Sequence, residues 1–357
     1  MQGSPDAIQA VSQRLERFVS ARVEEAADAG PLARPILELS AATLQGGKRL
    51  RAAFCYWGWR SVTDASHTDD IIAAAAALEV FHAAALVHDD IIDNSDTRRG
   101  RPATHRAFEA AHLAGGWTGD AAAYGRSSAI LAGDLLVAWS DDLFEEGIAD
   151  APAERARAAR RRYAEMRRDV TVGQYLDIAA ETVPAPDAEQ LDRALHVASF
   201  KSARYSVQQP LLIGAAIGGA STEQQEALRA FGHPVGMAFQ LRDDVLGVFG
   251  DSAATGKPSG DDLREGKRTA LIAFARQELP ASVRRTLDEL LGDPDLEDAQ
   301  VRMLQDTIRD SGALDRVEEL ITSYAREADR ALSGAPLDNA SVGALRDLAR
   351  AAVHRVA

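Results

Sequence analysis

Apolar residues recur at helical spacing along almost the whole length of this 357-residue chain. No stretch shows the alternation of apolar and polar residues that predicts half-buried strands. Gly- and Pro-containing stops separate the periodic stretches. The pattern predicts helices at roughly 6–29, 33–44, 48–64, 68–94, 117–147, 152–181, 187–219, 222–250, 267–278, 281–292, 298–312, 314–333 and 338–355. Since no low-complexity linker divides them, we expect one all-α domain over residues 1–357, a bundle of long antiparallel helices around a central cavity.

Composition excludes several classes of protein. The chain is 46% hydrophobic but only 6% aromatic, and its apolar set is dominated by alanine, which favours helices. The formal net charge of −14 argues against nucleic acid or an anionic membrane as the main partner, because both attract basic surfaces. The single cysteine, Cys55, excludes an internal disulfide and fits a reducing compartment.

Two segments are candidates for a signal peptide or a membrane span, and neither has the required pattern. Residues 1–20 lack the apolar core of a signal peptide. The most apolar stretch, 71–87, contains Glu79 and His82 and is too polar and short to span a bilayer. We therefore interpret it as a buried core helix and expect a cytoplasmic protein without stable membrane insertion.

Carboxylates are concentrated in two short segments that each follow an apolar stretch. In the segment 88–100, Asp89 and Asp93 lie one helical turn apart on the same face. A second pair, Asp243 and Asp244, lies far downstream. Carboxylates this close repel each other, and Mg²⁺ removes the repulsion while keeping coordination positions open for substrate phosphates.

Basic residues accompany these carboxylates. Arg98 and Arg99 directly follow the first acidic segment and can bind a diphosphate bidentately. In GGKRLR, 46–51, Lys48 and Arg51 are three residues apart at a predicted helix start, where free N–H groups favour an anion. Together with the acidic pairs, these residues indicate diphosphate chemistry.

His82 lies two turns before Asp89 on nearly the same helix face. The dipeptide His88-Asp89 also occurs in metal phosphohydrolases, but those sites use several histidines, whereas the companions here are carboxylates, arginines and lysines. Three lysines are further candidates because of the motifs around them: Lys201, Lys257 and Lys267.

Taken in order, the motifs closely resemble those of the trans-isoprenyl diphosphate synthases (polyprenyl synthetases), and most of all a geranylgeranyl diphosphate synthase. The resemblance covers about two-thirds of the chain. The matching motifs are GGKRLR at 46–51, FHAAALVHDDIIDNSDTRRG at 81–100, GDLL at 133–136, GQYLD at 173–177, KSARY at 201–205, FQLRDDVLGVFGD at 239–251 and GKPSGDDLREGKRT at 256–269.

The resemblance implies an all-α homodimer that uses three Mg²⁺ ions, and it implies roles for matching residues. Those implied to bind metal are Asp89, Asp93 and Asp243, supported by Asp90 and Asp244. Those implied to hold the allylic diphosphate are Arg98, Lys201, Gln240, Lys257 and Lys267, with Ser202 in the usual place of a threonine. Those implied to hold isopentenyl diphosphate are Lys48, Arg51, His82 and Arg99.

Two positions depart from the family pattern. Gly247 stands where many members have a third aspartate, so metal binding on this side would rest on Asp243 and Asp244. If those two suffice, Gly247→Asp is expected to change little. Ala52 replaces a proline that shapes the helix start, and we expect little consequence from that exchange.

The expected reaction is ionisation of the allylic diphosphate, attack by the double bond of isopentenyl diphosphate and loss of a proton to the released pyrophosphate. Ala84 and Ala85, just before the first acidic motif, are too small to stop chain growth. Phe81 is the first large side chain on that flank, about 12 Å along the helix axis from Asp89. We therefore expect geranylgeranyl diphosphate (C20) as the main product, with C15 or with C25 and longer products as the alternatives.

Two other functions remain open. A class I terpene cyclase shares the all-α fold and an Asp-rich first motif, but it needs no second diphosphate site. A non-catalytic subunit of a heteromeric synthase should lose its Asp-rich motifs, whereas this chain keeps the first one intact.

Overall fold

The computed structural model describes residues 3–65, 68–251 and 259–353, and within these ranges it confirms the all-α prediction. The helices are α1 (Gly3–Glu25), the 3₁₀ helix η1 (Ala26–Ala29), α2 (Arg34–Thr43), α3 (Leu50–Arg60), α4 (Asp69–Ile92), α5 (Thr104–Ala114), α6 (Ala121–Glu146), α7 (Ala153–Thr182), α8 (Asp187–Ala198), the π-helix η2 (Ser199–Gln208), α9 (Gln209–Gly218), α10 (Thr222–Phe249), α12 (Asp261–Glu265), α13 (Ala270–Glu278), α14 (Ala281–Leu290), α15 (Asp298–Asp310), α16 (Ala313–Ala331) and α17 (Asn339–Val353). The strands β1 (Thr97–Arg98) and β2 (Arg101–Pro102) form a small antiparallel pair.

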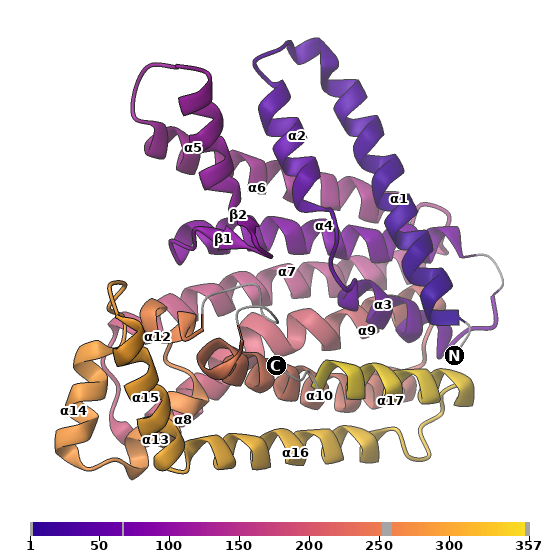
Figure 1. Ribbon diagram of the computed structural model, residues 1–357. Coiled ribbons are helices and arrows are strands. Elements are labelled where there is room, and N and C mark those ends of the chain that lie inside the picture. Colours follow the sequence, from indigo (N-terminus) through magenta and orange to yellow (C-terminus); the bar gives the residue numbers. More distant parts are fainter. Residues whose placement is uncertain (1–2, 66–67, 252–258, 354–357) are drawn as a thin grey trace.

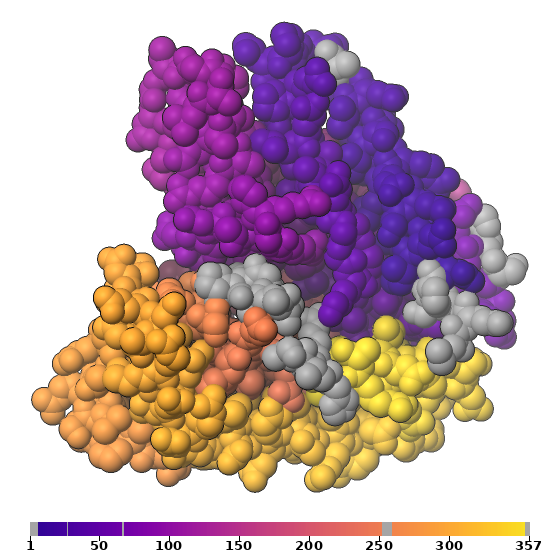
Figure 2. Space-filling model, in the orientation of Figure 1, coloured from indigo at the N-terminus to yellow at the C-terminus, as the bar shows by residue number. Residues whose placement is uncertain are grey.

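Figure 1 shows α4 and α7 crossing the middle of the molecule, with the α1–α2 hairpin and α5 above them and α16 and α17 on the opposite side. Helices α12 to α15 gather at one end. In the space-filling view of Figure 2, the indigo and purple N-terminal segments cover one side of this face and the orange and yellow C-terminal segments cover the other. The central helices that carry the acidic motifs therefore lie between two outer layers.

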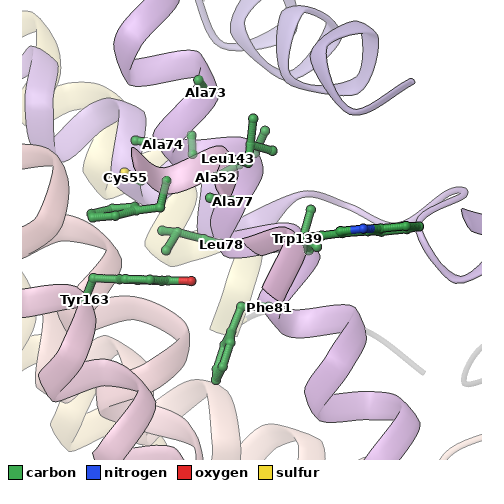
Figure 3. Close-up of a cluster of buried hydrophobic side chains, with 14 of the residues drawn as sticks. Ala52, Cys55, Ala73, Ala74, Ala77, Leu78, Phe81, Trp139, Leu143 and Tyr163 are labelled. Atoms are coloured by element: carbon green, nitrogen blue, oxygen red, sulfur yellow. The ribbon is translucent and has the colours of Figure 1, made fainter. Parts of the chain in front are cut away.

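Alanine makes α4 a core helix. Its five consecutive alanines, 73–77, are each 5% exposed or less, and their short side chains let neighbouring helices approach closely. Figure 3 shows Trp139 and Leu143 of α6 and Tyr163 of α7 packed around this part of α4. The helix is long and apolar enough to cross a membrane, but most of its apolar stretch is buried inside the fold, as expected of a core helix.

Two glycines bring α3 and α9 into backbone contact. A Cβ at Gly58 would lie 2.2 Å from the carbonyl oxygen of Leu211, and a Cβ at Gly214 would lie 1.9 Å from that of Cys55. Only hydrogen fits at either position. The crossing is therefore fixed by two backbones rather than by interlocking side chains.

Three local features differ from the sequence prediction. Helix α5 (Thr104–Ala114), the β1–β2 pair and helix α12 (Asp261–Glu265) occupy regions for which no element was predicted. The predicted helix 187–219 is continuous, but its middle ten residues form the π-helix η2. The predicted helix 48–64 begins only at Leu50, because Arg49 adopts a left-handed conformation with φ of 51°.

Candidate active site

Two lysines from distant segments meet the first acidic pair at the end of α4. Asp89 lies in the last turn of the helix and Asp93 caps its C-terminus. Lys201 Nζ is 3.4 Å from Asp89 Oδ1, and Lys267 Nζ is 2.7 Å from Asp93 Oδ1. The structure thus brings together four residues that the motifs singled out from three separate segments.

Two further carboxylates complete this acidic cluster: Asp177, which ends the motif GQYLD but was assigned no role, and Glu181, which lies in none of the motifs. Asp177 Oδ2 accepts a hydrogen bond from Lys201 Nζ at 2.5 Å and lies 3.5 Å from Lys267 Nζ. Glu181 Oε1 lies 3.4 Å from Lys267 Nζ. Both acids belong to α7 and are four residues apart, the same one-face spacing that identified the first pair. That spacing was the available signal.

The charges of this cluster support one another. Burial alone would lower the pKa of Lys201, but Asp89 and Asp177 more than offset it, so the pKa is raised. The pKa of Lys267 is also raised against burial, with Asp177 as its strongest charged partner. Burial works to raise the pKa of Asp89, yet the Lys201 ammonium leads the charges that lower it overall. Asp89, Lys201 and Lys267 are therefore ions at neutral pH.

In the tight hairpin formed by β1 and β2, the side chains of two adjacent arginines contact different partners. Arg99 and Gly100 have φ values of 53° and 71°, the pair of positive values that a two-residue type I′ turn requires. Arg98 Nε donates to Asp90 Oδ1 at 2.8 Å, while the guanidinium of Arg99 lies 3.1 Å from where a Cβ of Gly47 would be. Asp90 is only 2% exposed, so here it anchors Arg98.

Buried Glu79 of α4 holds the loop 46–51. Its Oε1 accepts a hydrogen bond from the backbone N–H of Ala52 at 3.0 Å, and its Oε2 lies 3.8 Å from Arg49 Nη1. A proline at position 52 could not donate this bond, so the exchange to Ala52 has a consequence that was not expected. Lys48 precedes the helix in an exposed loop, which corrects its predicted place within the first helical turn.

His82 belongs to a separate polar group beside this loop. Its Nδ1 lies 3.0 Å from Tyr205 Oη. Arg51 stacks 4.3 Å above the centre of the Tyr205 ring and donates to Ser206 Oγ at 2.8 Å. Burial, reinforced by Arg51 and Arg99, holds the pKa of His82 well below its ordinary value. At neutral pH His82 is thus an uncharged hydrogen-bonding group.

The π-helix η2 brings Lys201 to the acidic cluster. Such widened turns are frequent at functional sites. Helix α7 touches η2 at Gly173, where a Cβ would lie 2.3 Å from the backbone nitrogen of Lys201. This close approach lets Lys201 reach Asp177 one turn further along α7. Ser202, the next residue, is half-buried.

The second acidic pair lies on α10 together with a carboxylate from α12. Asp244 is 7% exposed and accepts a hydrogen bond from Gln240 Nε2 at 2.7 Å. Gln240 is therefore engaged with Asp244 rather than directed only at a substrate. Burial, followed by the charge of Asp262, raises the pKa of Asp244 well above its ordinary value. Asp243, half-buried, stands one residue before it.

The carboxylates fit a hard cation with few protein ligands. Asp89 Oδ1 is buried and receives no hydrogen bond from the described part of the chain. Within the same part, no group of three or more His, Cys, Asp or Glu side chains is spaced to form a complete metal cage. Mg²⁺ is commonly held by one or two carboxylates, with water and substrate phosphates completing its shell. Lys257 lies outside the described residues.

The three predicted chain-length residues lie on one part of α4. Ala84 is fully buried, Phe81 is 6% exposed and Ala85 is half-buried. The ring of Phe81 lies edge-on to Tyr205, with centroids 6.0 Å apart, and to Tyr163, 6.4 Å apart. Figure 3 shows Phe81 and Tyr163 below Leu78.

Known proteins resemble this chain in both sequence and fold. The polyprenyl synthetase family matches residues 34–308. The crystal structure of geranylgeranyl pyrophosphate synthase from Corynebacterium glutamicum, complexed with isoprenyl diphosphate and magnesium, superposes with a TM-score of 0.93 and 37% identity over 98% of both chains.

Curated relatives give the same result. The geranylfarnesyl diphosphate synthase of Aeropyrum pernix is 33% identical over 85% of this chain and 88% of its own. The geranylgeranyl diphosphate synthase of Methanosarcina mazei is 32% identical over 80% and 79%, respectively. With the all-α fold and the grouping of acidic and basic motifs around α4, these matches show that the chain belongs to the polyprenyl synthetase family and is a prenyltransferase.

Proposed function

We propose that this enzyme condenses isopentenyl diphosphate head-to-tail with an allylic prenyl diphosphate and that its main product is geranylgeranyl diphosphate. The observation that carries the proposal is that the cationic residues around α4 form two groups with different contacts. Lys201, Lys267 and Arg98 face the acidic cluster, whereas Arg51 and Arg99 gather beside the loop 46–51. A terpene cyclase needs one diphosphate site, so the second group favours condensation.

The first group would hold the allylic diphosphate. Mg²⁺, which we propose as three ions bound through Asp89, Asp93 and Asp243, supplies charge stabilisation for the departing diphosphate. Lys201 and Lys267 add fixed positive charge at the same place, preorganised before the bond breaks.

The second group would hold isopentenyl diphosphate close to the allylic carbon. Arg51 and Arg99 bind its diphosphate, and neutral His82 donates a hydrogen bond, so that the double bond is positioned for attack. The proton that is lost passes to the released pyrophosphate. The buried aromatic surface of Phe81 and Tyr205 helps exclude water, which would otherwise convert the allylic cation to an alcohol.

Steady-state kinetics can test this division. Arg51→Gln is expected to raise the KM for isopentenyl diphosphate by about 10- to 100-fold, the loss expected of one charged contact. Lys201→Gln is expected to impair use of the allylic substrate instead. Identical effects of both variants on both substrates would contradict two separate sites.

An aromatic column supports a C20 product. Behind Phe81, the ring of Tyr163 stacks on Phe144 with centroids 4.1 Å apart, and the Tyr163 hydroxyl pairs with Ser140. A prenyl tail growing past the small Ala84 would meet these three rings from three helices. A tail that passes Phe81 would give C25 or longer products.

We propose that the enzyme is a cytoplasmic homodimer joined through α6 and α7. These helices run antiparallel, held by pairs such as Arg160 with Glu145. Both present large exposed apolar side chains, namely Ile130 and Leu131 on α6 and Val172, Tyr175 and Ile178 on α7. Light scattering should show a dimer that Leu131→Arg weakens, and a wild-type monomer would contradict the proposal.

The deciding experiment is incubation of the purified protein with Mg²⁺, isopentenyl diphosphate and each allylic primer in turn, followed by chromatography of the products. A C20 product is expected. Cyclic hydrocarbons formed without isopentenyl diphosphate would instead identify a cyclase, and no turnover with any primer would identify a non-catalytic subunit.

A further inference from the structure

One side of α7 contacts the π-helix η2 through three residues that are spaced four apart: Asp169, Gly173 and Asp177. Residues at this spacing lie on the same side of a helix. At Gly173 the two backbones touch, and Asp177 accepts a hydrogen bond from Lys201. Asp169 belongs to none of the motifs, and no step of the proposed reaction accounts for it.

Asp169 makes a second ion pair with η2. Its side chain is buried, and its Oδ2 accepts a hydrogen bond from Arg204 Nη1 at 3.3 Å. Arg204 follows Lys201 by three residues, so one ion pair joins α7 to η2 on each side of Gly173. A buried carboxylate is costly unless it is paired, and this cost keeps Arg204 at its place on α7.

The direction of the Arg204 side chain is fixed from a second side. Its guanidinium carbon lies 3.8 Å from the centre of the Phe200 ring, and guanidinium groups commonly stack on aromatic faces in this way. The other oxygen of Asp169, Oδ1, accepts a hydrogen bond from Arg168 Nη2 at 2.8 Å. Arg168 is exposed and belongs to α7 itself, so its pair with Asp169 does not fasten η2.

Backbone contacts alone leave η2 free to slide along its neighbours. It touches α7 at Gly173 and α10 at Gly236, where a Cβ would lie 2.4 Å from the carbonyl oxygen of Ala203. Because neither glycine has a side chain, these contacts set the distance between the helices but not their register. A hydrogen bond between Ser199 and His233 joins the first residue of η2 to α10, and η2 can still turn about a single bond.

The two halves of η2 are held by different contacts. Ser206, which accepts a hydrogen bond from Arg51, lies near its end, and η2 continues directly into α9, which Gly214 fixes against α3. Lys201 lies in the first half, and its ion pair and that of Arg204 join η2 to α7. These two ion pairs therefore set the register of η2 on α7.

We propose that Asp169 and Arg204 are positioning residues, whose ion pair holds the register of η2 on α7 and so keeps Lys201 directed at Asp89. Lys201 is proposed to bind the allylic diphosphate and would exchange a partner when it does so. The pair of Asp169 and Arg204 lies outside the acidic cluster and stays intact. The effect on the reaction rests on the proposed function, whereas the fastening of η2 to α7 does not.

Steady-state kinetics of Asp169→Asn, Arg204→Gln and the double variant test the proposal. Each single variant is expected to raise the KM for the allylic substrate by about tenfold, because a small misplacement far from the chemistry can cost up to about 100-fold. The KM for isopentenyl diphosphate should change much less, since the end of η2 that contacts Arg51 is held by α9. The double variant should be no worse than Arg204→Gln, as expected of two residues that act as one pair.

The matched control is Arg168→Gln, which removes the other partner of the same carboxylate and should keep both KM values of the wild type. Amide hydrogen exchange should become faster in residues 199–208 of Asp169→Asn and Arg204→Gln, and stay unchanged there in the control. Circular dichroism checks that each variant is folded. Should Asp169→Asn not fold, Arg204→Gln, whose side chain is partly exposed, carries the test against the same control.

An unchanged allylic KM in the folded single variants overturns the proposal, and so do equal increases in both KM values. Additive effects in the double variant also overturn it, because the two residues would then act separately. Wild-type protein that transfers no prenyl group with any primer would overturn the proposed function instead. Faster exchange confined to residues 199–208 would in that case still show that the ion pair holds η2.

Discussion

The carboxylate of Asp262 lies against Gly247, so close that a Cβ on the glycine would come within 2.0 Å of Asp262 Oδ2. The resemblance of its motif implies a third aspartate where Gly247 stands. In this chain Asp262 of α12, a different segment, places its carboxylate in the space beside Gly247. Gly247 therefore has two effects. It leaves one acid fewer on α10, and it leaves the space in which Asp262 lies beside Asp244.

This arrangement revises the expectation that Gly247→Asp changes little. The new side chain would displace Asp262 and add a like charge, so we expect a lower melting temperature and lower turnover, measured by thermal unfolding and steady-state assay. The control is Gly343→Ala in α17, where a Cβ meets no atom within 4 Å and should stabilise the helix by about 0.5–1 kcal/mol. If Gly247→Asp behaves like wild type, Asp262 moves aside freely.

Loss of Asp93 should separate catalysis from folding. In Asp93→Ala, Lys267 keeps Asp177 and Glu181 as partners, so the unfolding temperature should change little. Turnover with Mg²⁺ should fall by at least about a hundredfold, as when one preorganised charge contact is lost. The control Asp96→Ala removes an exposed acid paired with Arg106 and should stay near wild type. If both variants showed comparable turnover, the first acidic motif would not be part of the active site.

The bond between Ala52 and Glu79 should position the loop 46–51. Ala52→Pro removes the donated N–H, adds a ring at a fully buried position and disfavours the helical conformation of Arg51, so the protein should lose more than the roughly 1 kcal/mol that is typical of one hydrogen bond. The KM for isopentenyl diphosphate should rise several-fold while that for the allylic substrate stays constant. Glu79→Gln, which keeps an acceptor, should show a smaller change. Equal increases in both KM values would indicate general damage instead.

Phe81 alone should not set the full product length, because Tyr163 and Phe144 stand behind it. Phe81→Ala should therefore lengthen the product modestly, and Phe81→Ala combined with Tyr163→Ala should lengthen it further. Ala84→Tyr, which places a ring above this column, should shorten the product towards C15. Product chromatography measures all three. Unchanged lengths would mean that the tail runs along a different part of the fold.

The pKa of His82 predicts how stability depends on pH. Its value is lowered well below the ordinary 6.5, so the folded state binds this proton less readily than the unfolded state. The stability associated with neutral His82 is fully present above about pH 6.5 and is lost as the pH falls towards the lowered value. Denaturant titrations should show a steeper loss in wild type than in His82→Gln. His105 and His233 also have lowered pKa values, but they are common to both proteins and cancel in the difference. Parallel pH profiles would contradict a neutral, buried His82.

The sequence pattern was sufficient for prediction where a single segment contains both the motif and the residues that lie together. The helical spacing of Asp89 and Asp93 could be read directly, and the composition of α4 identified a core helix. Contacts between distant segments could not be read in this way. Asp177 pairs with Lys201, and Asp262 lies against Gly247, and each of these partners belongs to another segment of the chain. The conformation of a single residue could not be predicted either. The left-handed Arg49, which places Lys48 outside the helix, depends on its buried partner Glu79.

The backbone contact between α3 and α9 bears on how accurately two substrates can be aligned. Helix α3 begins next to Arg51, and α9 continues directly from the segment that carries Lys201. Gly58 and Gly214 therefore fix, by hard-sphere contact, the spacing of the segments that carry Arg51 and Lys201, the residues proposed to hold the two diphosphates. Carbon–carbon bond formation depends on sub-ångström alignment. A single methyl group at either glycine would therefore shift the two reacting carbons out of alignment.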